Sequence, residues 1–363
     1  NTNTTYCGSD PSQPGPGVDL NRNYPFHWGG QGASTSQCNE TYRGPSGGSE
    51  PETKAVVDYI RAIFPDARPN DMTTPAPDTT PGLFFDIHSF SQLVLWSWGD
   101  TTTVAPNGAA LEILGRRIGW FNGYDPQQSI GLYPTTGTTD DTAYGELGIA
   151  AYTIELGVAF FESCSSFESS TFPHNFDALR YAARTTFAPY KLAFGPDTTT
   201  IAASPDLAVA GQPVALTARV DDTRINTTPQ PQSGAPPVPM TATDGTFNSG
   251  SEAVQATIDT TGMASGKHLV YVQGVDSGGA KGAPQAVFVE VAQANEIATV
   301  HGRVIDAATQ SPLAATLKFG TAQFNAGANG EYSHVLRSGT VDIEASAPGY
   351  MTERASGVAI AGG

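Results

Sequence analysis

The chain has 363 residues, which is enough for two or three domains. Its charged fraction is only 15%, while Gly and Pro number 40 and 27, a composition that suits loop-rich α/β and all-β modules better than helical bundles. The net charge of −17 favours solubility and argues against a nucleic-acid partner, because phosphate binding needs clustered Lys and Arg. No apolar run is long enough to cross a membrane.

The first 64 residues divide into a loop region and a helix. Residues 1–50 are broken by Gly-Pro-Gly and Gly-Gly and are predicted to be loops. Residues 51–64 are predicted to form a helix with Ser49 as its N-cap, because apolar residues recur at helical spacing. These residues are Val56, Val57, Ile60 and Ile63.

Short apolar runs then alternate with helical patterns. Residues 83–87, 93–96 and 149–154 are predicted to be strands, and the first and third read as strands buried on both faces. Residues 109–121 and 175–188 are predicted to be helices. This order indicates an α/β fold with a mostly parallel or mixed sheet and flanking helices. His88 and Glu155 directly follow two of the strands, so we expect both at the carboxyl edge of the sheet.

The pattern changes near residue 196. Residues 214–220, 268–272 and 287–291 alternate in polarity and are separated by turn-rich stretches that include residues 229–239. This predicts a small, immunoglobulin-like β-sandwich over residues 196–294.

Three short segments carry a family resemblance. They are Asp19–Tyr24 (DLNRNY), Asp86–Ser91 (DIHSFS) and Tyr152–Leu156 (YTIEL). In this order and spacing they resemble the second half of a zinc carboxypeptidase of the carboxypeptidase A/B type. The resemblance covers residues 1–195 and implies that they form part of a catalytic domain.

A separate resemblance covers residues 295–363. The sequences GRVID, SPL and APGY occur there in that order. They resemble the transthyretin-like regulatory domain that accompanies some carboxypeptidases. The expected organisation is therefore a catalytic unit followed by two small all-β sandwich domains.

The resemblance implies a role for each candidate site residue. His88 would be a zinc ligand, and Glu155 would be the general base that takes a proton from water and delivers it to the leaving amine. Ser89 would line the substrate channel. Phe90 stands where many relatives have Tyr, so the role of that hydroxyl is lost.

Other residues would bind the substrate, which the resemblance implies is the C-terminus of a peptide or protein. Asn21 and Arg22 would hold its free carboxylate, for which the planar fork of Arg is well suited. Tyr133 would cap the substrate. Asp140 would form the floor of the side-chain pocket and favour C-terminal Lys or Arg, although its neighbour Asp141 leaves a one-residue uncertainty in the alignment.

The sequence also lacks part of the expected site. A catalytic zinc site has three protein ligands, but none of the six histidines is followed three positions later by Glu. We therefore expect the other two ligands to lie on an upstream fragment of the same catalytic domain. The alternatives are an inactive peptidase-fold binding protein and a carboxypeptidase that trims cell-wall peptides. The Asp-rich loops also leave room for calcium, without EF-hand spacing.

The three cysteines bear on the compartment. Cys7 and Cys38 flank a Gly-, Pro- and Ser-rich loop, and a disulfide between them is the default in an exported protein. Relatives pair cysteines at equivalent positions. Cys164 is left over, either as a free buried thiol or paired with a cysteine upstream. We expect a secreted, extracellular protein.

Overall fold

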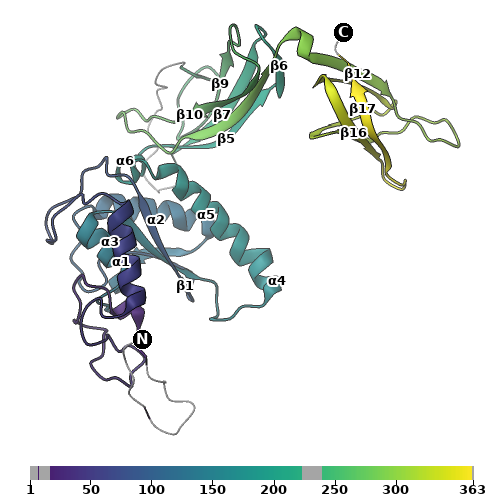
Figure 1. Cartoon of the computed structure of the whole chain (residues 1–363). Helices are drawn as coiled ribbons and strands as arrows, with labels where there is room; N and C mark the ends of the chain where they lie inside the picture. Colours follow the sequence, from purple (N-terminus) through teal and green to yellow (C-terminus); the bar gives the residue numbers. More distant parts are fainter. Residues whose placement is uncertain (1–6, 8–16, 223–238, 362–363) are drawn as a thin grey trace.

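The structure, a computed structural model, describes residues 7, 17–222 and 239–361. Its elements form an α/β unit followed by two groups built almost entirely of strands (Figure 1). None of the helices in these ranges combines the length and apolar character needed to span a membrane.

The α/β unit contains one four-stranded sheet in the order β1-β4-β2-β3. β1 pairs parallel with β4, β4 antiparallel with β2, and β2 parallel with β3. The expected α/β fold with a mixed, mostly parallel sheet is therefore confirmed. The elements of this unit are η1 Leu20–Arg22, α1 Pro51–Ile63, β1 Leu83–Ser89, β2 Leu93–Trp96, α2 Gly108–Asn122, β3 Asp125–Gln128, η2 Ser129–Gly131, α3 Thr139–Leu147, β4 Ala150–Leu156, α4 Cys164–Ser166, η3 Phe167–Thr171, α5 Phe172–Thr185 and α6 Pro189–Leu192.

Successive side chains of β4 point to opposite faces of this sheet, as they do along any strand. The Tyr152 hydroxyl donates to the carbonyl oxygen of Leu111 in α2, 2.9 Å away. Thr153 turns to the opposite face, where α3 packs against β1 and β4. α2 and α5 contact each other (Figure 1), and both contribute to the main apolar core. The predicted apolar side of α2 is buried at Leu111, Leu114 and Ile118.

Strand β1 departs from its prediction. It is only partly buried along its length, and Ile87 is 47% exposed. The reason is its position: β1 lies at one end of the four-stranded order, so one of its edges has no partner among the described strands. The expectation of a strand buried on both faces was therefore wrong for β1, whereas it is confirmed for β4.

The helix boundaries also shift slightly. Glu50, not Ser49, is the N-cap residue of α1, and its side chain makes no capping hydrogen bond. The Ser49 hydroxyl instead donates to the Glu50 carboxylate at 3.1 Å. The last helix of the unit, α5, begins at Phe172, three residues before the predicted start, with Pro173 in its first turn.

The strands after residue 196 form two further groups. The first contains the sheets β5-β7-β9-β8 and β10-β11-β6, and the second contains β12-β15 and β14-β13-β16-β17. β7 alternates strictly between buried and exposed positions, as predicted for residues 214–220. The bounds are β5 Asp197–Ser204, β6 Leu207–Val209, β7 Val214–Asp221, β8 Thr241–Ala242, β9 Ser251–Ile258, β10 Gly266–Val272, β11 Gln285–Ala292, η5 Ala294–Glu296, β12 Ile297–Arg303, β13 Thr316–Phe319, β14 Ala322–Asn325, β15 Glu331–Arg337, β16 Gly339–Ser346 and β17 Glu353–Ile360.

The two strand groups have hydrophobic clusters of their own. This arrangement accords with the predicted boundaries at residues 196 and 295, which remain predictions, as do the immunoglobulin-like and transthyretin-like assignments. Part of the turn-rich stretch 229–239 lies outside the described residues.

Candidate active site

The two residues expected at the carboxyl edge of the sheet are direct neighbours. His88 at the end of β1 is paired in register with Glu155 near the end of β4. Cross-strand partners point to the same face of a sheet, and here both side chains line one cavity of about 390 Å³. The same cavity is lined by every other residue predicted to bind substrate: Asn21, Arg22, Ser89, Tyr133 and Asp140.

His88 has a carboxylate partner that the sequence reasoning missed. Asp86 lies two residues earlier on β1, and its Oδ2 is 3.0 Å from His88 Nε2. This hydrogen bond is the main cause that raises the pKa of His88, while burial opposes the rise and the negative charges of Asp86, Glu155 and Asp140 reinforce it. The period of two along a strand was the signal that could have identified Asp86.

Glu155 occupies a partly buried position beside His88. Burial raises the pKa of its carboxyl group above the ordinary value, the positive charge available on His88 opposes this, and the charge of Asp86 adds to it. A carboxyl group whose pKa is moved towards neutrality can both accept and return a proton. The position of Glu155 therefore suits a general base.

Residues 19–23 form a tight turn that presents the predicted carboxylate-binding residues. The Asp19 side chain accepts the backbone N–H of Asn21 at 3.0 Å, and this caps η1. Arg22 is buried, with Nε donating to the carbonyl of Gly32 at 2.9 Å and Nη1 to that of Asn21 at 2.7 Å. These two hydrogen bonds hold the guanidinium in place. Because a guanidinium has five N–H donors, others remain for a ligand.

The third polar residue of this turn has a different role. Asn23 is completely buried, and its Nδ2 donates to the carbonyls of Arg43 and Ser46 and to the hydroxyl of Ser49. Its Oδ1 accepts the backbone N–H of Glu50 at 3.1 Å. Asn23 therefore ties the turn to the start of α1, and it does not line the cavity.

The two adjacent carboxyl groups at the start of α3 point in different directions. Asp140 lines the cavity, and Ser129 Oγ donates to its Oδ2 at 3.2 Å. Asp141 turns away and accepts the backbone N–H of Gly99 at 2.9 Å. Both are buried, and burial raises the pKa of each carboxyl group, that of Asp141 more strongly. Of the two, only Asp140 is placed to meet a ligand in the cavity.

Aromatic side chains border the cavity. The Tyr133 ring is 49% exposed, and its centroid is 6.0 Å from the guanidinium carbon of Arg22. Phe90 packs edge-on against Phe160, with ring centroids 4.9 Å apart. Both phenylalanines line the cavity, which therefore has an apolar wall beside its charged floor.

Part of the chain is similar to known proteins. A family model described as zinc carboxypeptidase matches residues 2–168. This region is therefore similar to zinc carboxypeptidases.

Curated relatives and a solved structure share parts of this region. A metallocarboxypeptidase A-like protein of Trichophyton verrucosum is 40% identical over 97 residues, 26% of this chain and 20% of the relative. Carboxypeptidase B of Bos taurus is 31% identical over 163 residues, 43% and 34% of the two chains. The crystal structure of thrombin activatable fibrinolysis inhibitor aligns with a TM-score of 0.40 and 26% identity, covering 50% of this chain and 46% of that one. The chain thus spans about a fifth and about a third of the lengths of these two curated relatives.

The cavity fits one part of the zinc site that this family implies. A neutral imidazole is a standard zinc ligand, and the carboxylates around His88 would balance the charge of a cation. However, no group of three or more His, Cys, Asp or Glu side chains arranged to hold a metal occurs in residues 17–222 and 239–361 or at residue 7. Calcium in the Asp-rich loops stays a prediction.

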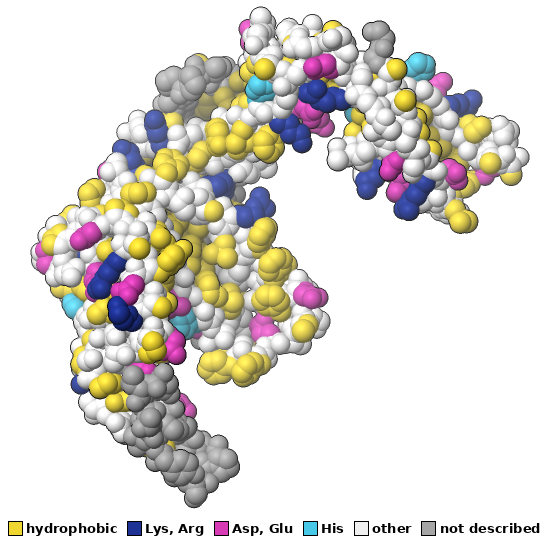
Figure 2. Space-filling model, in the orientation of Figure 1, with side chains coloured by type: hydrophobic (Ala, Val, Ile, Leu, Met, Phe, Trp, Pro, Cys, Tyr) yellow, Lys and Arg dark blue, Asp and Glu magenta, His cyan; other side chains and the backbone are white. Residues whose placement is uncertain are grey.

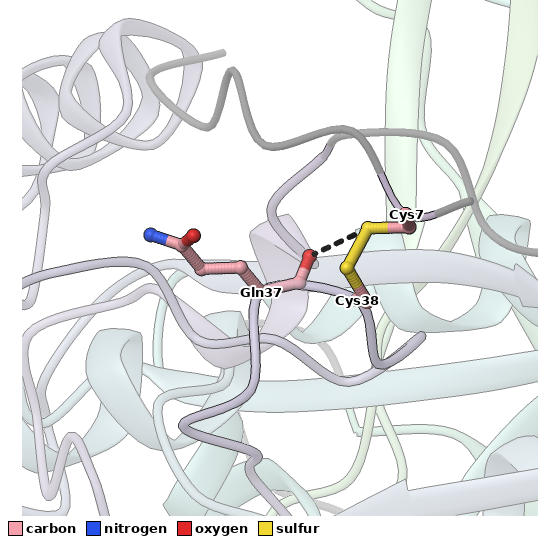
Figure 3. The surroundings of a disulfide bond; sticks show 3 residues. All are labelled: Cys7, Gln37 and Cys38. Carbon is pink, nitrogen blue, oxygen red and sulfur yellow. Dashed lines mark hydrogen bonds between the residues drawn. A yellow bond between two sulfur atoms is a disulfide. The ribbon is translucent and has the colours of Figure 1, made fainter.

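The predicted disulfide is present in the structure. Cys7 is joined to Cys38 with their Cα atoms 5.4 Å apart, and Cys7 Sγ lies 3.8 Å from the carbonyl oxygen of Gln37 (Figure 3).

Cys164, at the start of α4, is a free thiol, but it is exposed and not buried as the first alternative supposed. Its pairing with a cysteine on another segment remains a prediction.

Proposed function

We propose that this chain is part of a secreted zinc metallocarboxypeptidase that hydrolyses the C-terminal peptide bond and prefers C-terminal Lys or Arg. The observation that carries the proposal is the convergence of His88, Glu155 and Arg22 on one cavity. These residues come from three segments far apart in the sequence. A ligand, a base and a carboxylate anchor within one cavity are the parts that exopeptidase chemistry needs.

Each residue of the cavity would have its own role in binding the substrate or in catalysis. Arg22 and Asn21 hold the free carboxylate of the substrate, and Tyr133 covers it from the exposed side. Zinc, held in part by His88, would polarise the scissile carbonyl and activate water. Glu155 accepts a proton from the attacking water and returns it to the leaving amine. An internal peptide bond offers no charge to Arg22, so the site selects chain ends.

The preference for a basic residue rests on Asp140. Its carboxyl group lines the cavity while that of its neighbour Asp141 does not. A cation placed beside a buried carboxylate compensates its charge directly. Carboxypeptidase B of Bos taurus is among the relatives, which accords with this preference.

The remaining zinc ligands would come from a polypeptide segment outside the described residues. The open edge of β1 supports this, because an unpaired strand edge presents N–H and C=O groups ready for pairing. Apolar grooves adjoin both ends of that strand. One groove, of about 740 Å³, is lined by Ile87 and by the loop around Phe160 and Phe161. The other groove, of about 400 Å³, is lined by Tyr59, Ile63 and Leu83. Hydrophobic side chains also gather near this loop in Figure 2.

The test uses the protein purified from its natural source. Intact mass and N-terminal sequencing would show whether a further segment accompanies the chain, and elemental analysis would give the zinc content. We expect about one zinc per molecule and release of C-terminal Lys from a peptide with a free carboxylate. The same peptide with an amidated C-terminus should be a poor substrate.

Two variants sharpen the result. Glu155→Gln should keep zinc and lose activity by about 10²- to 10⁴-fold, whereas His88→Ala should lose zinc. A zinc-free, inactive native protein would instead favour the binding-protein alternative.

A further inference from the structure

The first strand group is packed against the α/β unit at the level of the backbone. Gly195 and Pro196, which lead from α6 into β5, lie against Lys281 and Gly282 in the connection between β10 and β11. A Cβ atom on Gly195 would lie 2.1 Å from the carbonyl carbon of Lys281, and a Cβ atom on Gly282 would lie 1.8 Å from the carbonyl oxygen of Pro196. Both glycines are therefore required for this close approach of two backbones.

The apolar core of the α/β unit continues across this contact. Ala283 follows Gly282 in the strand group, and it is completely buried in the same hydrophobic cluster as Leu114 and Ile118 of α2. Interiors packed to this density leave two segments few alternative arrangements. The α/β unit and the first strand group therefore share part of one core.

Charged side chains of two helices complete the junction. Arg117 of α2 lies 2.6 Å from Asp197 of β5, and both side chains are completely buried. Arg184 of α5 donates to the carbonyl oxygen of Thr198 in β5 at 3.1 Å and to the side-chain oxygen of Gln285 in β11 at 2.8 Å. Separating the two parts would break a buried ion pair, which is far more costly than breaking an exposed one.

The second strand group is attached in a different way. Its hydrophobic cluster, which includes Leu317 and Phe319, contains only residues of that group. Among the described residues, Arg337 makes the ion pairs that connect it to the preceding segment, with Glu290 and Glu296, and these side chains are partly exposed. Exposed pairs contribute little to stability. In Figure 1 this group stands away from the α/β unit.

We propose that the α/β unit and the first strand group unfold as one cooperative unit, in which residues 197–292 support helix α2, and that the second strand group unfolds separately. Domains within a chain ordinarily meet at polar surfaces and move relative to each other. A shared core and a buried ion pair oppose such motion. The support extends to the cavity, because α2 accepts the hydrogen bond of Tyr152, on the same strand as Glu155. This proposal concerns folding and holds independently of the proposed function.

Tryptophan fluorescence of the full chain tests the proposal, because all four tryptophans lie in the α/β unit. Val289→Ala removes two methyl groups from a completely buried position in a hydrophobic cluster formed only by the first strand group. It should lower the denaturant midpoint of the tryptophan signal, since a cooperative unit loses stability as a whole. Leu317→Ala is the matched control in the second strand group and should leave this midpoint unchanged.

Hydrogen exchange measured by mass spectrometry locates the lost stability. Val289→Ala should accelerate the slowest exchange in α2 as well as in β11, whereas Leu317→Ala should accelerate exchange only in the second strand group. An unchanged tryptophan midpoint in Val289→Ala, with faster exchange confined to the first strand group, would overturn the proposal. An equal decrease of the midpoint in both variants would overturn the separate unfolding of the second group.

Two glycine substitutions test the junction itself. Gly282→Ala places a methyl group against the carbonyl oxygen of Pro196 and should lower the tryptophan midpoint. Gly278→Ala, in the same connection between β10 and β11, meets its nearest atom, Asp276 Oδ1, at 3.3 Å and should have little effect. Equal midpoints in the two variants would show that the backbone contact does not couple the strand group to the α/β unit.

Discussion

Arg117 Nη1 lies 2.6 Å from Asp197 Oδ1 where helix α2 meets strand β5, and both side chains are completely buried. Arg117 Nη2 also donates to the carbonyl of Gly195 at 2.6 Å. This ion pair joins the α/β unit to the first strand group. A buried charge without its partner is costly, so the junction depends on the pair being complete.

Arg117→Met should therefore lower the free energy of unfolding by about 3 to 5 kcal/mol, because it leaves Asp197 buried and uncompensated. Denaturant titration followed by tryptophan fluorescence measures this. The control is the adjacent Arg116→Ala, which removes an exposed pair with Glu112 and should cost less than about 1 kcal/mol. Equal effects of the two substitutions would contradict the assigned role of Arg117.

Asp222 should make stability at the same junction depend on pH. Burial raises the pKa of Asp222 to about 6, and Arg117, 3.9 Å away, limits the rise. The folded chain thus holds a proton that the unfolded chain releases near the ordinary Asp value. Between that value and about pH 6 the folded state binds more protons, so the contribution of Asp222 to stability decreases as pH rises.

Asp222→Asn removes this titration and should flatten the dependence over that range, as measured by melting temperature against pH. Asp259→Asn is the control with the opposite sign, because its hydrogen bonds to Thr261 lower the pKa of Asp259. A parallel pH profile in Asp222→Asn and the unmodified protein would show that Asp222 is not responsible.

Asp140→Asn should reduce kcat/KM for peptides ending in Lys by about 10- to 100-fold, because a hydrogen bond to a charged group contributes about 1.5–3 kcal/mol. Cleavage of peptides that end in an apolar residue should not change. In the unmodified protein, cleavage of Lys-ending peptides should fall as pH decreases through the raised pKa of Asp140, since the protonated carboxyl no longer attracts a cation. Asp141→Asn is the matched control. It should affect stability but not the preference between the two substrates.

Arg22→Lys should raise KM more than it lowers kcat, because Lys retains a positive charge but not the planar fork. We expect a loss of about 10- to 100-fold in kcat/KM for substrates with a free carboxylate. Amidated substrates, which lack that charge, should show no further loss. A similar loss for both substrates would indicate that the substitution had disturbed the loop that Arg22 holds through Gly32.

Local patterns were sufficient to predict part of the cavity lining. The apolar runs before His88 and Glu155 predicted two strands ending together, and the register of β1 with β4 places these side chains opposite each other. The spacing of Leu111, Leu114 and Ile118 likewise predicted α2 and its buried side. These features depend on the periods of strand and helix, which neighbouring residues set.

Other features depended on segments far apart in the sequence. The open edge of β1 follows from the order of the strands, which the apolar run 83–87 does not reveal. The different roles of Asp140 and Asp141 follow from how α3 packs against β1 and β4. The pairing of Asp86 with His88 lay within a recognised motif, but its importance appeared only when Thr139 was found on the same carboxylate.

The sequence by itself determined which residue types stand at the ends of the strands and which family motifs they form, because side-chain alternation and helical spacing are properties of a few consecutive residues. Only the tertiary structure decided which carboxyl group faces the cavity, which strand is left at the edge of the sheet and which nitrogen of His88 is held by Asp86. Those outcomes are set by contacts such as Thr139 with Asp86, made between chain segments that come together only when the sheet is assembled.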